Sequence, residues 1–351
     1  MSDHTPPAIE RCCDVAVLGA SEAGLAAALE LVRLGRSVLV VDGSSPTGSG
    51  CEELRRHGGE ILTGRVLVVD RGDDGTGCLG LGGGHALLAR YVVDAGAGAA
   101  SGEDVADGVR FVVASSAVDG SRAAAEVAAV LDEEDGARPG RRSGDEVEWD
   151  HRYAGDGPMW SGNPNGTLVA ELAELAPGRV LDVGAGEGGD AIWLAERGWR
   201  VTASDISSTA LALVAAEARR RGLEVECLHR DANEPGAFDA GAYDLVSMQY
   251  GAIHRTPDDR GLQNLTASVA AGGTLLVVGH DLAPLGGPVD VATQARMFDP
   301  GAYLGVDAIA TALAEVSGWE IECHEVRGRP PGAASAHHVE DVVLRARKHR
   351  R

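Results

Sequence analysis

Lysine is almost absent from this sequence of 351 residues, whose 31 cationic side chains are 30 arginines and Lys348. Schiff-base catalysis and Walker-type phosphate loops depend on a lysine in a defined pattern, so both are excluded. Positive charge is also scarce overall, because the formal net charge is −22. A nucleic-acid partner needs clustered cations to neutralise its phosphates. We therefore expect no nucleic acid as a partner and favour a small-molecule substrate.

Membrane and metal patterns are missing as well. No run of about 18 apolar residues occurs, and the segment MSDHTPPAIE has neither the basic nor the apolar part of a signal peptide. The six cysteines form no C-x-x-C pair, and no histidine lies at zinc-site spacing from them. These absences predict a reduced cytoplasmic protein with no metal site and no membrane contact.

One arrangement occurs twice: an apolar strand, a glycine-rich turn, an amphipathic helix and a second strand that ends in aspartate. The first copy is VAVLGASEAGLAAALELVRLGRSVLVVD, ending at Asp42, and the second is RVLDVGAGEGGDAIWLAERGWRVTASD, ending at Asp205. Glycines permit a tight turn and a close approach of a ligand to the backbone. The helix N-terminus offers N–H groups, and the acid accepts hydrogen bonds from ribose hydroxyls. Both halves therefore predict an α/β nucleotide-binding fold, that is, two Rossmann-like units.

The two copies differ beside the turn. The second copy has Asp182 two residues before its first glycine, where the first copy has Val17. A carboxylate at this place repels a pyrophosphate and attracts a cationic amino-acid headgroup. The second turn, with closely spaced Gly184, Gly186 and Gly188, is thus predicted to bind S-adenosylmethionine. The first is predicted to bind a dinucleotide through Gly19, Ser21, Gly24 and Asp42.

The charged stretch DEEDGARPGRRSGDEVE separates the two copies. It predicts a linker or an exposed helix end over residues 132–148, between a domain at 1–131 and a domain at 149–351. Strands that alternate with helices predict mostly parallel sheets covered on both faces. In the second domain we expect helices at 190–197, 209–221 and 306–316, buried strands at 225–228, 245–247 and 274–278, and a terminal strand pair at 319–326 and 339–345.

The second half also carries a series of motifs: WDHRYAGDGPMWSGNPN, VLDVGAGEG, VTASDIS, HRDANE, YDLVSMQY and AGGTLLVVGH. Together they resemble class I S-adenosylmethionine-dependent methyltransferases of the thiopurine-methyltransferase and tellurite-resistance type. The resemblance implies a seven-stranded sheet with an antiparallel edge. It also implies that the cofactor's methionine part lies at Asp182 and at the backbone of Gly184, Ala185 and Gly186. Its ribose would lie on Asp205 and its adenine against Ile206, Asp231 and Ala232.

The same resemblance suggests an acceptor side. The first motif is either a packed flap or a lid whose aromatic rings, Trp160 among them, flank the sulfonium. Met248, Gln249 and Tyr250 are expected at the rim where the methyl group points. An acceptor that must lose a proton needs a base, for which His254, His280 and His151 are candidates, whereas a thiol is already partly ionised and needs none. Tyr250 is a further candidate for a catalytic role.

The first half shows DVAVLGASEAGLAAALEL, VLVVD, ELRRHGGEILTGRVLVVDRGDDG and LLARYVVDAGA. Residues 12–135 on this basis resemble a shortened flavin domain of the thioredoxin-reductase-like oxidoreductases, which occurs fused to methyltransferases. Ser21 replaces the second motif glycine, Ala114-Ser115-Ser116 replaces a glycine–aspartate pair, and the nicotinamide subdomain with its C-x-x-C is missing. Without these parts, electrons have no evident route to or from a bound flavin. We therefore expect the first domain to be a remnant of an oxidoreductase that serves as a scaffold or a homodimer surface. Bound FAD stays an alternative.

Three hypotheses about function follow. The first is a methyltransferase that uses S-adenosylmethionine and acts on a small molecule, with a thiol or another soft nucleophile favoured. The second is a bifunctional FAD-dependent oxidoreductase and methyltransferase. The third is a cofactor-binding regulator without catalytic activity.

Overall fold

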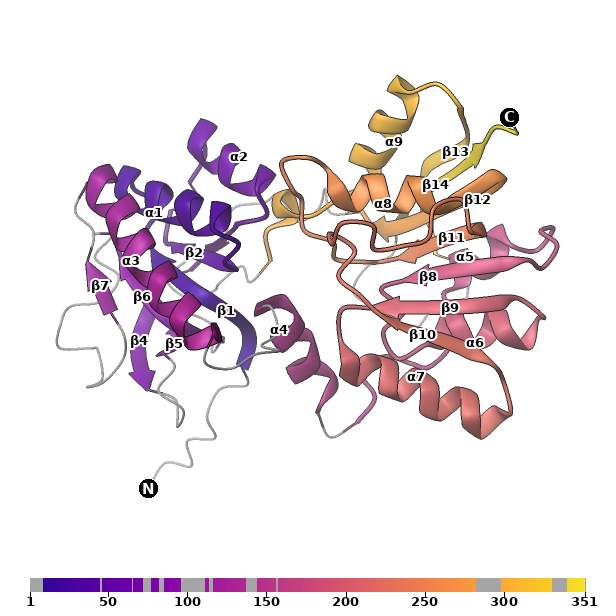
Figure 1. Ribbon diagram of the computed structural model, residues 1–351, viewed down its shortest axis with the longest axis horizontal. Coiled ribbons are helices and arrows are strands. Elements are labelled where there is room, and N and C mark those ends of the chain that lie inside the picture. Colours follow the sequence, from indigo (N-terminus) through magenta and orange to yellow (C-terminus); the bar gives the residue numbers. More distant parts are fainter. Residues whose placement is uncertain are drawn as a thin grey trace. The chain divides into compact units, whose positions relative to one another are not determined.

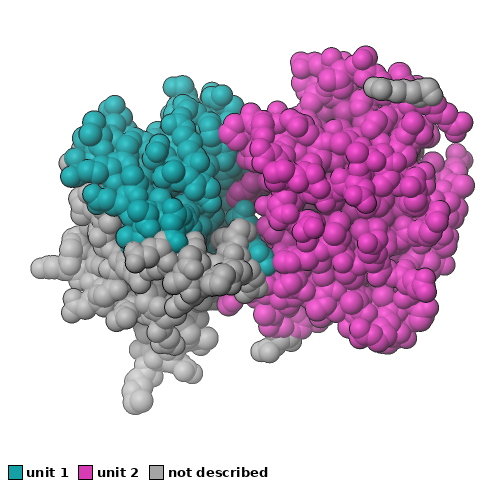
Figure 2. Space-filling view, viewed as in Figure 1, with its two compact units in different colours: residues 1–148, 287–303 teal, residues 149–286, 304–351 magenta. Residues whose placement is uncertain are grey.

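The computed structural model describes residues 9–44, 46–64, 66–71, 77–81, 85–95, 111–113, 116–136, 144–155, 157–281, 298–329 and 340–350. The chain divides into two compact units, drawn in different colours in Figure 2. The first comprises residues 1–148 and 287–303, and the second comprises 149–286 and 304–351. The segment 287–303, which contains the short helix η3 (Pro300–Ala302), thus belongs to the first unit, although the chain before and after this segment belongs to the second.

The first unit is built on a sheet of seven strands in the order β3-β2-β1-β6-β5-β4, with β7 beside β6. Strands β1, β2, β3, β6 and β7 run parallel, whereas β4 and β5 are antiparallel to their neighbours. The strands are β1 (Ile9–Leu18), β2 (Val38–Asp42), β3 (Glu60–Thr63), β4 (Val66–Arg71), β5 (Gly77–Leu81), β6 (Ala86–Asp94) and β7 (Phe111–Val113), and the helices are α1 (Glu22–Arg33), α2 (Ser49–Arg56) and α3 (Ala117–Gly136).

Helices cover one face of this sheet. Leu31 of α1, Leu54 of α2 and Leu131 of α3 are buried with the side chains of β1 and β2 in one cluster. Gly120 lets α3 approach α1 closely, because a Cβ there would lie 2.2 Å from the carbonyl oxygen of Ala23. The buried cluster on the opposite face consists of strand residues alone.

The second unit holds a seven-stranded sheet in the order β10-β9-β8-β11-β12-β14-β13. Its first five strands are parallel, and β14 pairs antiparallel with both β12 and β13. The α/β class and the antiparallel edge expected from the sequence are therefore confirmed. The strands are β8 (Arg179–Val183), β9 (Arg200–Asp205), β10 (Val225–His229), β11 (Tyr243–Gln249), β12 (Val269–His280), β13 (Trp319–Gly328) and β14 (Glu340–Lys348).

Helices lie on both faces of the second sheet, as the ribbon in Figure 1 shows. Side chains of α8 and α9 pack in one cluster with alternate residues of β8, β11 and β12. Side chains of α5, α6 and α7 pack in a second cluster with the intervening residues of the same strands. This alternation is the period of two that a strand buried on both faces requires. The helices are α4 (Gly144–Tyr153), α5 (Gly166–Glu171), α6 (Gly189–Glu196), α7 (Ser208–Arg221), α8 (Arg260–Ser268) and α9 (Val306–Glu315).

Within the stretch 132–148, α3 extends to Gly136 and α4 begins at Gly144. Glu148 is buried and accepts a hydrogen bond from Arg11. One expectation from the sequence is wrong. Strand β10 is largely exposed rather than buried, because it lies at the edge of its sheet. Residues 137–143, 114–115 and 282–297 lie outside the described part of the chain.

Candidate functional site

The site begins at the turn after β8, where glycine is required twice. Gly186 and Gly188 have φ values of +52° and +85°, a region that other residues rarely adopt. A Cβ on Gly186 would lie 2.9 Å from the hydroxyl oxygen of Tyr153, and one on Gly188 would lie 2.8 Å from Val214. The turn therefore lets a ligand approach the backbone closely at the start of α6, while the N–H groups of Gly184, Ala185 and Gly186 bond to Ser204 and Asp205.

Asp205, the last residue of β9, fixes this turn. Its Oδ2 accepts a hydrogen bond from the N–H of Gly186 at 2.8 Å, and its Oδ1 accepts one from the N–H of Ser207 at 2.8 Å. Burial raises the pKa of Asp205, and these backbone hydrogen bonds only partly oppose the rise. Each carboxylate oxygen has a second lone pair, so the group can still accept the hydroxyls of a ribose.

Asp182, at the turn's other side, has an incomplete set of hydrogen bonds. Its side chain is 2% exposed, and within the described residues its Oδ2 has no hydrogen-bond partner. Burial, followed by the charges of Asp190 and Asp205, raises its pKa well above the usual range. A buried oxygen without a partner costs about 1–3 kcal/mol. Asp182 therefore fits a cationic donor such as the ammonium group of S-adenosylmethionine.

Asp190 adds a third buried acid that the sequence analysis missed. It lies in the first turn of α6, and burial raises its pKa even though Asn165 donates to both its oxygens at 2.7 and 2.6 Å. No motif marked Asp190, because its role depends on the fold of the preceding segment. The three acids together give the turn a negative potential, which favours a cationic ligand.

The segment at residues 149–165 folds against the same turn. Glu187 accepts hydrogen bonds from the N–H groups of Met159 and Trp160 at 2.8 and 2.9 Å. The indole N–H of Trp160 donates to the hydroxyl of Tyr153 at 3.4 Å, and the indole stays 55% exposed. Trp160 thus lies at the turn, as the sequence predicts, with one face available. Its role as a lid stays a prediction.

The predicted adenine residues follow the ends of β9 and β10. The carbonyl of Ile206 lies 2.9 Å from Nε2 of His229, and Asp231 accepts the N–H of Asn233 at 2.8 Å. Ala232 is buried, and its carbonyl accepts a hydrogen bond from Asn264. Parallel strands end at one edge, so these residues share an edge with Asp182 and Asp205.

The acceptor side contains a second cluster, centred on Asp341 of β14. This side chain is fully buried, and its Oδ2 accepts the hydroxyls of Thr167 and Tyr250 at 2.8 and 2.9 Å. Burial, followed by the charge of Asp341, raises the pKa of Tyr250. Tyr250 therefore stays protonated and is a hydrogen-bond donor. Asp341 was missed because only the return of β14 beside β12 brings it here.

Other predicted residues are also placed by the fold. Gln249, buried at the end of β11, donates to the hydroxyl of Ser247 at 3.1 Å, and its Oε1 has no partner within the described residues. The carbonyl of His254 accepts a hydrogen bond from Asn233 at 3.0 Å, which fixes its backbone. The use of its imidazole as a base stays a prediction.

The first unit repeats the geometry of the turn at Gly19, where φ is +96°. Asp42 accepts a hydrogen bond from the N–H of Ala20 at 2.8 Å. Burial raises the pKa of Asp42, but the hydrogen bonds from Ala20 and Ser44 outweigh burial, so the pKa is lowered. Ser21 caps α1 and donates to the carbonyl of Ala95 at 2.9 Å. Gly24 needs to be glycine, because a Cβ there would lie 2.0 Å from the carbonyl oxygen of Gly19.

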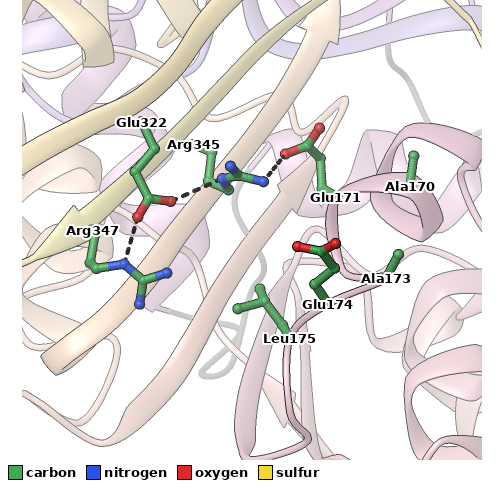
Figure 3. A pocket seen from close by; sticks show the side chains of 8 residues that line it. All are labelled: Ala170, Glu171, Ala173, Glu174, Leu175, Glu322, Arg345 and Arg347. Carbon is green, nitrogen blue, oxygen red and sulfur yellow. Dashed lines mark hydrogen bonds and ion pairs between the residues drawn. The ribbon is translucent and has the colours of Figure 1, made fainter.

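A cavity of about 400 Å³ in the second unit lies elsewhere, between α5 and the strands β13 and β14 (Figure 3). Arg345 donates to Glu171 and Glu322, and Arg347 donates to Glu322. Arg347 is opposite Thr274, near the start of β12, so the cavity is at the amino end of that strand. None of the predicted site residues lines it.

The described residues contain no cluster of three or more side chains suited to a metal ion. Among the same residues, no helix is long and apolar enough to cross a membrane.

Comparison with known proteins finds a family match within the second unit. Residues 180–273 match the family model described as "Methyltransferase domain". Such a domain implies S-adenosylmethionine as its cofactor, which agrees with the unpaired oxygen of Asp182.

Individual relatives match over about a third of the chain. Ribosomal RNA small subunit methyltransferase C of Chromohalobacter salexigens is 31% identical over 119 residues, which are 33% of this chain and 36% of that protein. Ubiquinone biosynthesis O-methyltransferase of Cronobacter sakazakii is 33% identical over 113 residues, 31% of this chain and 46% of that protein. The chain thus spans less than half the length of these relatives. The solved structure of a SAM-dependent methyltransferase from Methanosarcina mazei covers 52% of this chain and 98% of its own, with a TM-score of 0.41 and 19% identity.

Proposed function

We propose that this protein transfers a methyl group from S-adenosylmethionine to a small molecule, with a thiol or another soft nucleophile as the favoured acceptor. The observation that carries the proposal is the buried, unpaired Oδ2 of Asp182 beside a glycine turn that Asp205 holds open. A buried carboxylate oxygen without a partner is costly unless a ligand supplies a donor. The ammonium group of the cofactor is such a donor.

In this proposal each part of the cofactor meets a chemically matched group. Asp182 binds the ammonium group and Asp205 binds the ribose hydroxyls. The buried acids, including Asp190, favour a ligand that carries a sulfonium. Trp160 offers a ring face to the same cation, an attraction of about 0.5–2 kcal/mol. The adenine is bound by Ile206, Asp231 and Ala232, and the methionine part lies against the backbone of Gly184, Ala185 and Gly186.

The acceptor chemistry follows from what the site lacks. When bound, the cofactor supplies a methyl carbon that is already activated, so this chain's residues mainly orient the acceptor and exclude water. The hydroxyl of Tyr250 donates a hydrogen bond to Asp341 and does not act as a base. A thiol needs little help with deprotonation. The net charge of −22 disfavours RNA, although one relative is named as a ribosomal RNA methyltransferase.

The direct test is calorimetric titration with S-adenosylmethionine. We expect Asp205→Ala to weaken binding about 10-fold to 100-fold, because two hydrogen bonds to a charged group are worth about 1.5–3 kcal/mol each. Asp42→Ala is the matched control, since it removes the equivalent acid in the first unit, and it should leave the affinity unchanged. A wild-type protein that does not bind the cofactor would overturn the proposal.

Turnover separates the enzyme from the regulator. Panels of thiols, amines and hydroxyl compounds with radiolabelled methyl donor should show transfer to at least one small acceptor, with thiols first. Cofactor binding without transfer to any acceptor class would favour a non-catalytic regulator.

For the first unit we propose a remnant of a dinucleotide fold that serves as a scaffold. The proposal is supported by the turn at Gly19 and Asp42, which keeps the geometry of such a site, and by the missing C-x-x-C and nicotinamide subdomain. Purified protein should be colourless. Stoichiometric flavin absorbance would instead favour the bifunctional oxidoreductase and methyltransferase.

A further inference from the structure

Arg329, just after β13, lies at the same edge of the second sheet as the glycine turn. In the sheet, β11 lies beside β8, β12 beside β11, and β14 beside β12. His280, at the end of β12, is paired with Asp341 at the start of β14. The chain after β11 passes the glycine turn closely, because a Cβ on Gly184 would lie 3.6 Å from the Cα of Gly251. Tyr250 therefore stands between the turn and the cluster that holds Arg329.

The guanidinium of Arg329 is held in one orientation. Its Nε donates to Oδ1 of Asp341 at 2.7 Å, its Nη2 lies 2.7 Å from Nδ1 of His280, and its central carbon lies 4.9 Å from the centre of the Tyr250 ring. The side chain is only 9% exposed. Among the described residues, Nη1 makes no hydrogen bond. A fixed guanidinium with unused N–H groups is prepared for a ligand.

The position of Tyr250 suggests that this arrangement is functional. Its φ of +55° is in the left-handed region, which costs a side chain other than glycine about 1–3 kcal/mol. The strain is maintained by the hydrogen bond from its hydroxyl to Asp341 and by stacking on His280 at 4.5 Å between ring centres. Such strain is common where a side chain must be aimed at a ligand.

The hydrogen-bond pattern also gives the direction of the contacts around Arg329. A guanidinium can only donate, so Nδ1 of His280 accepts a hydrogen bond from Arg329. The hydroxyl of Tyr250 donates to Asp341. The N–H groups of Arg329 that these contacts leave unused suit a ligand group that accepts hydrogen bonds.

We propose that Arg329 recognises a carboxylate on the methyl acceptor, an inference that rests on the proposed methyltransferase function. The planar fork of arginine matches the two oxygens of a carboxylate. Asp341 already balances the positive charge of Arg329. A singly charged carboxylate therefore leaves a smaller excess of negative charge at the cluster than a doubly charged phosphate would. Binding the carboxylate sets the distance between the acceptor atom and the methyl carbon.

The test uses the full chain saturated with S-adenosylhomocysteine and a matched pair of probes, 3-mercaptopropionate and its methyl ester, in NMR titrations. We expect the wild type to bind the acid about 10-fold more tightly than the ester. Arg329→Gln should abolish this preference by weakening the acid alone, and Arg329→Lys, which keeps the charge opposite Asp341, should lose most of it. Arg327→Gln, which removes an arginine paired with Glu171, should behave as the wild type.

Three results would overturn the inference. The first is equal or undetectable binding of the two probes by the wild type. The second is a preference for the acid that survives in both Arg329 variants. The third is a loss of S-adenosylhomocysteine affinity in Arg329→Gln, which would assign Arg329 to the cofactor. Failure of the proposed function gives a different result, because the wild type would then bind neither S-adenosylmethionine nor S-adenosylhomocysteine.

Discussion

The two units of this chain form the same turn and place it in different surroundings. In each, an aspartate at the end of the second strand accepts one N–H from the glycine turn and another from the residue two positions later: Asp42 from Ala20 and Ser44, and Asp205 from Gly186 and Ser207. Only Asp205 is accompanied by the buried acids Asp182 and Asp190. The geometry of the turn is therefore generic, and the residues around it determine the charge of the ligand.

The units also differ in how their cores are closed. The second unit buries both faces of its sheet under helices, whereas the buried cluster on one face of the first sheet consists of strand residues. The first unit also includes residues 298–303, which come late in the sequence. In the first unit Arg11 pairs with the fully buried Glu60, which also accepts the hydroxyl of Tyr303 at 2.7 Å. Asp299 accepts from Arg55 and from the N–H of Ile61. The first unit thus depends on a part of the chain that is distant in sequence.

The largest effect is expected at this buried ion pair. Glu60→Ala removes one of the two carboxylates that pair with the buried Arg11, the other being Glu148, so the first unit should lose up to about 3–5 kcal/mol of unfolding free energy, read from chemical denaturation. Glu217→Ala removes the exposed partner of Arg220 and Arg221 and should change stability little. Similar losses in the two variants would contradict the buried role of Glu60.

A smaller loss is expected at the glycine turn of the first unit. Gly24→Ala places a Cβ against the carbonyl of Gly19, which should cost about 1–3 kcal/mol by overpacking. Gly43→Ala is the control, because a Cβ there meets no atom within 4 Å. Hydrogen exchange of β1 and β2 should rise in the first variant and not in the second. Unchanged exchange in both would indicate that the turn is not closely packed.

The two units should respond to pH in opposite directions. Burial raises the pKa of Asp190 to about 6, above its unfolded value of about 4, so this acid binds more protons folded than unfolded. The second unit without cofactor therefore loses stability as pH rises from about 4 to 6. Asp42 has a lowered pKa, so its contribution is present above about pH 4 and is lost as pH falls. Hydrogen exchange of β8 and β1 between pH 4 and 7 checks both signs.

Local patterns in the sequence predicted much of this molecule. The apolar strands, the glycine turns and the acids Asp42 and Asp205 lie within about 30 residues of each other, the length of a βαβ unit, where periodicity and turn chemistry suffice. Residues joined over long distances were not predicted. Arg329 and Asp341 reach the site only through the antiparallel return of β13 and β14, and no motif marks them.

The segment at residues 298–303 was missed for the same reason. Its sequence gives no sign that Asp299 and Tyr303 bind residues near the beginning of the chain.

The central claim is that Asp182 makes the second turn a site for a cationic headgroup. Titration of wild type and Asp182→Asn with S-adenosylmethionine at pH 7.5 tests this most directly. Asparagine keeps the size and one acceptor oxygen but removes the charge, so we predict a loss of affinity of at least about 10-fold, or 1.4 kcal/mol. Equal affinity of the two proteins, with both folded by thermal unfolding, would contradict the account.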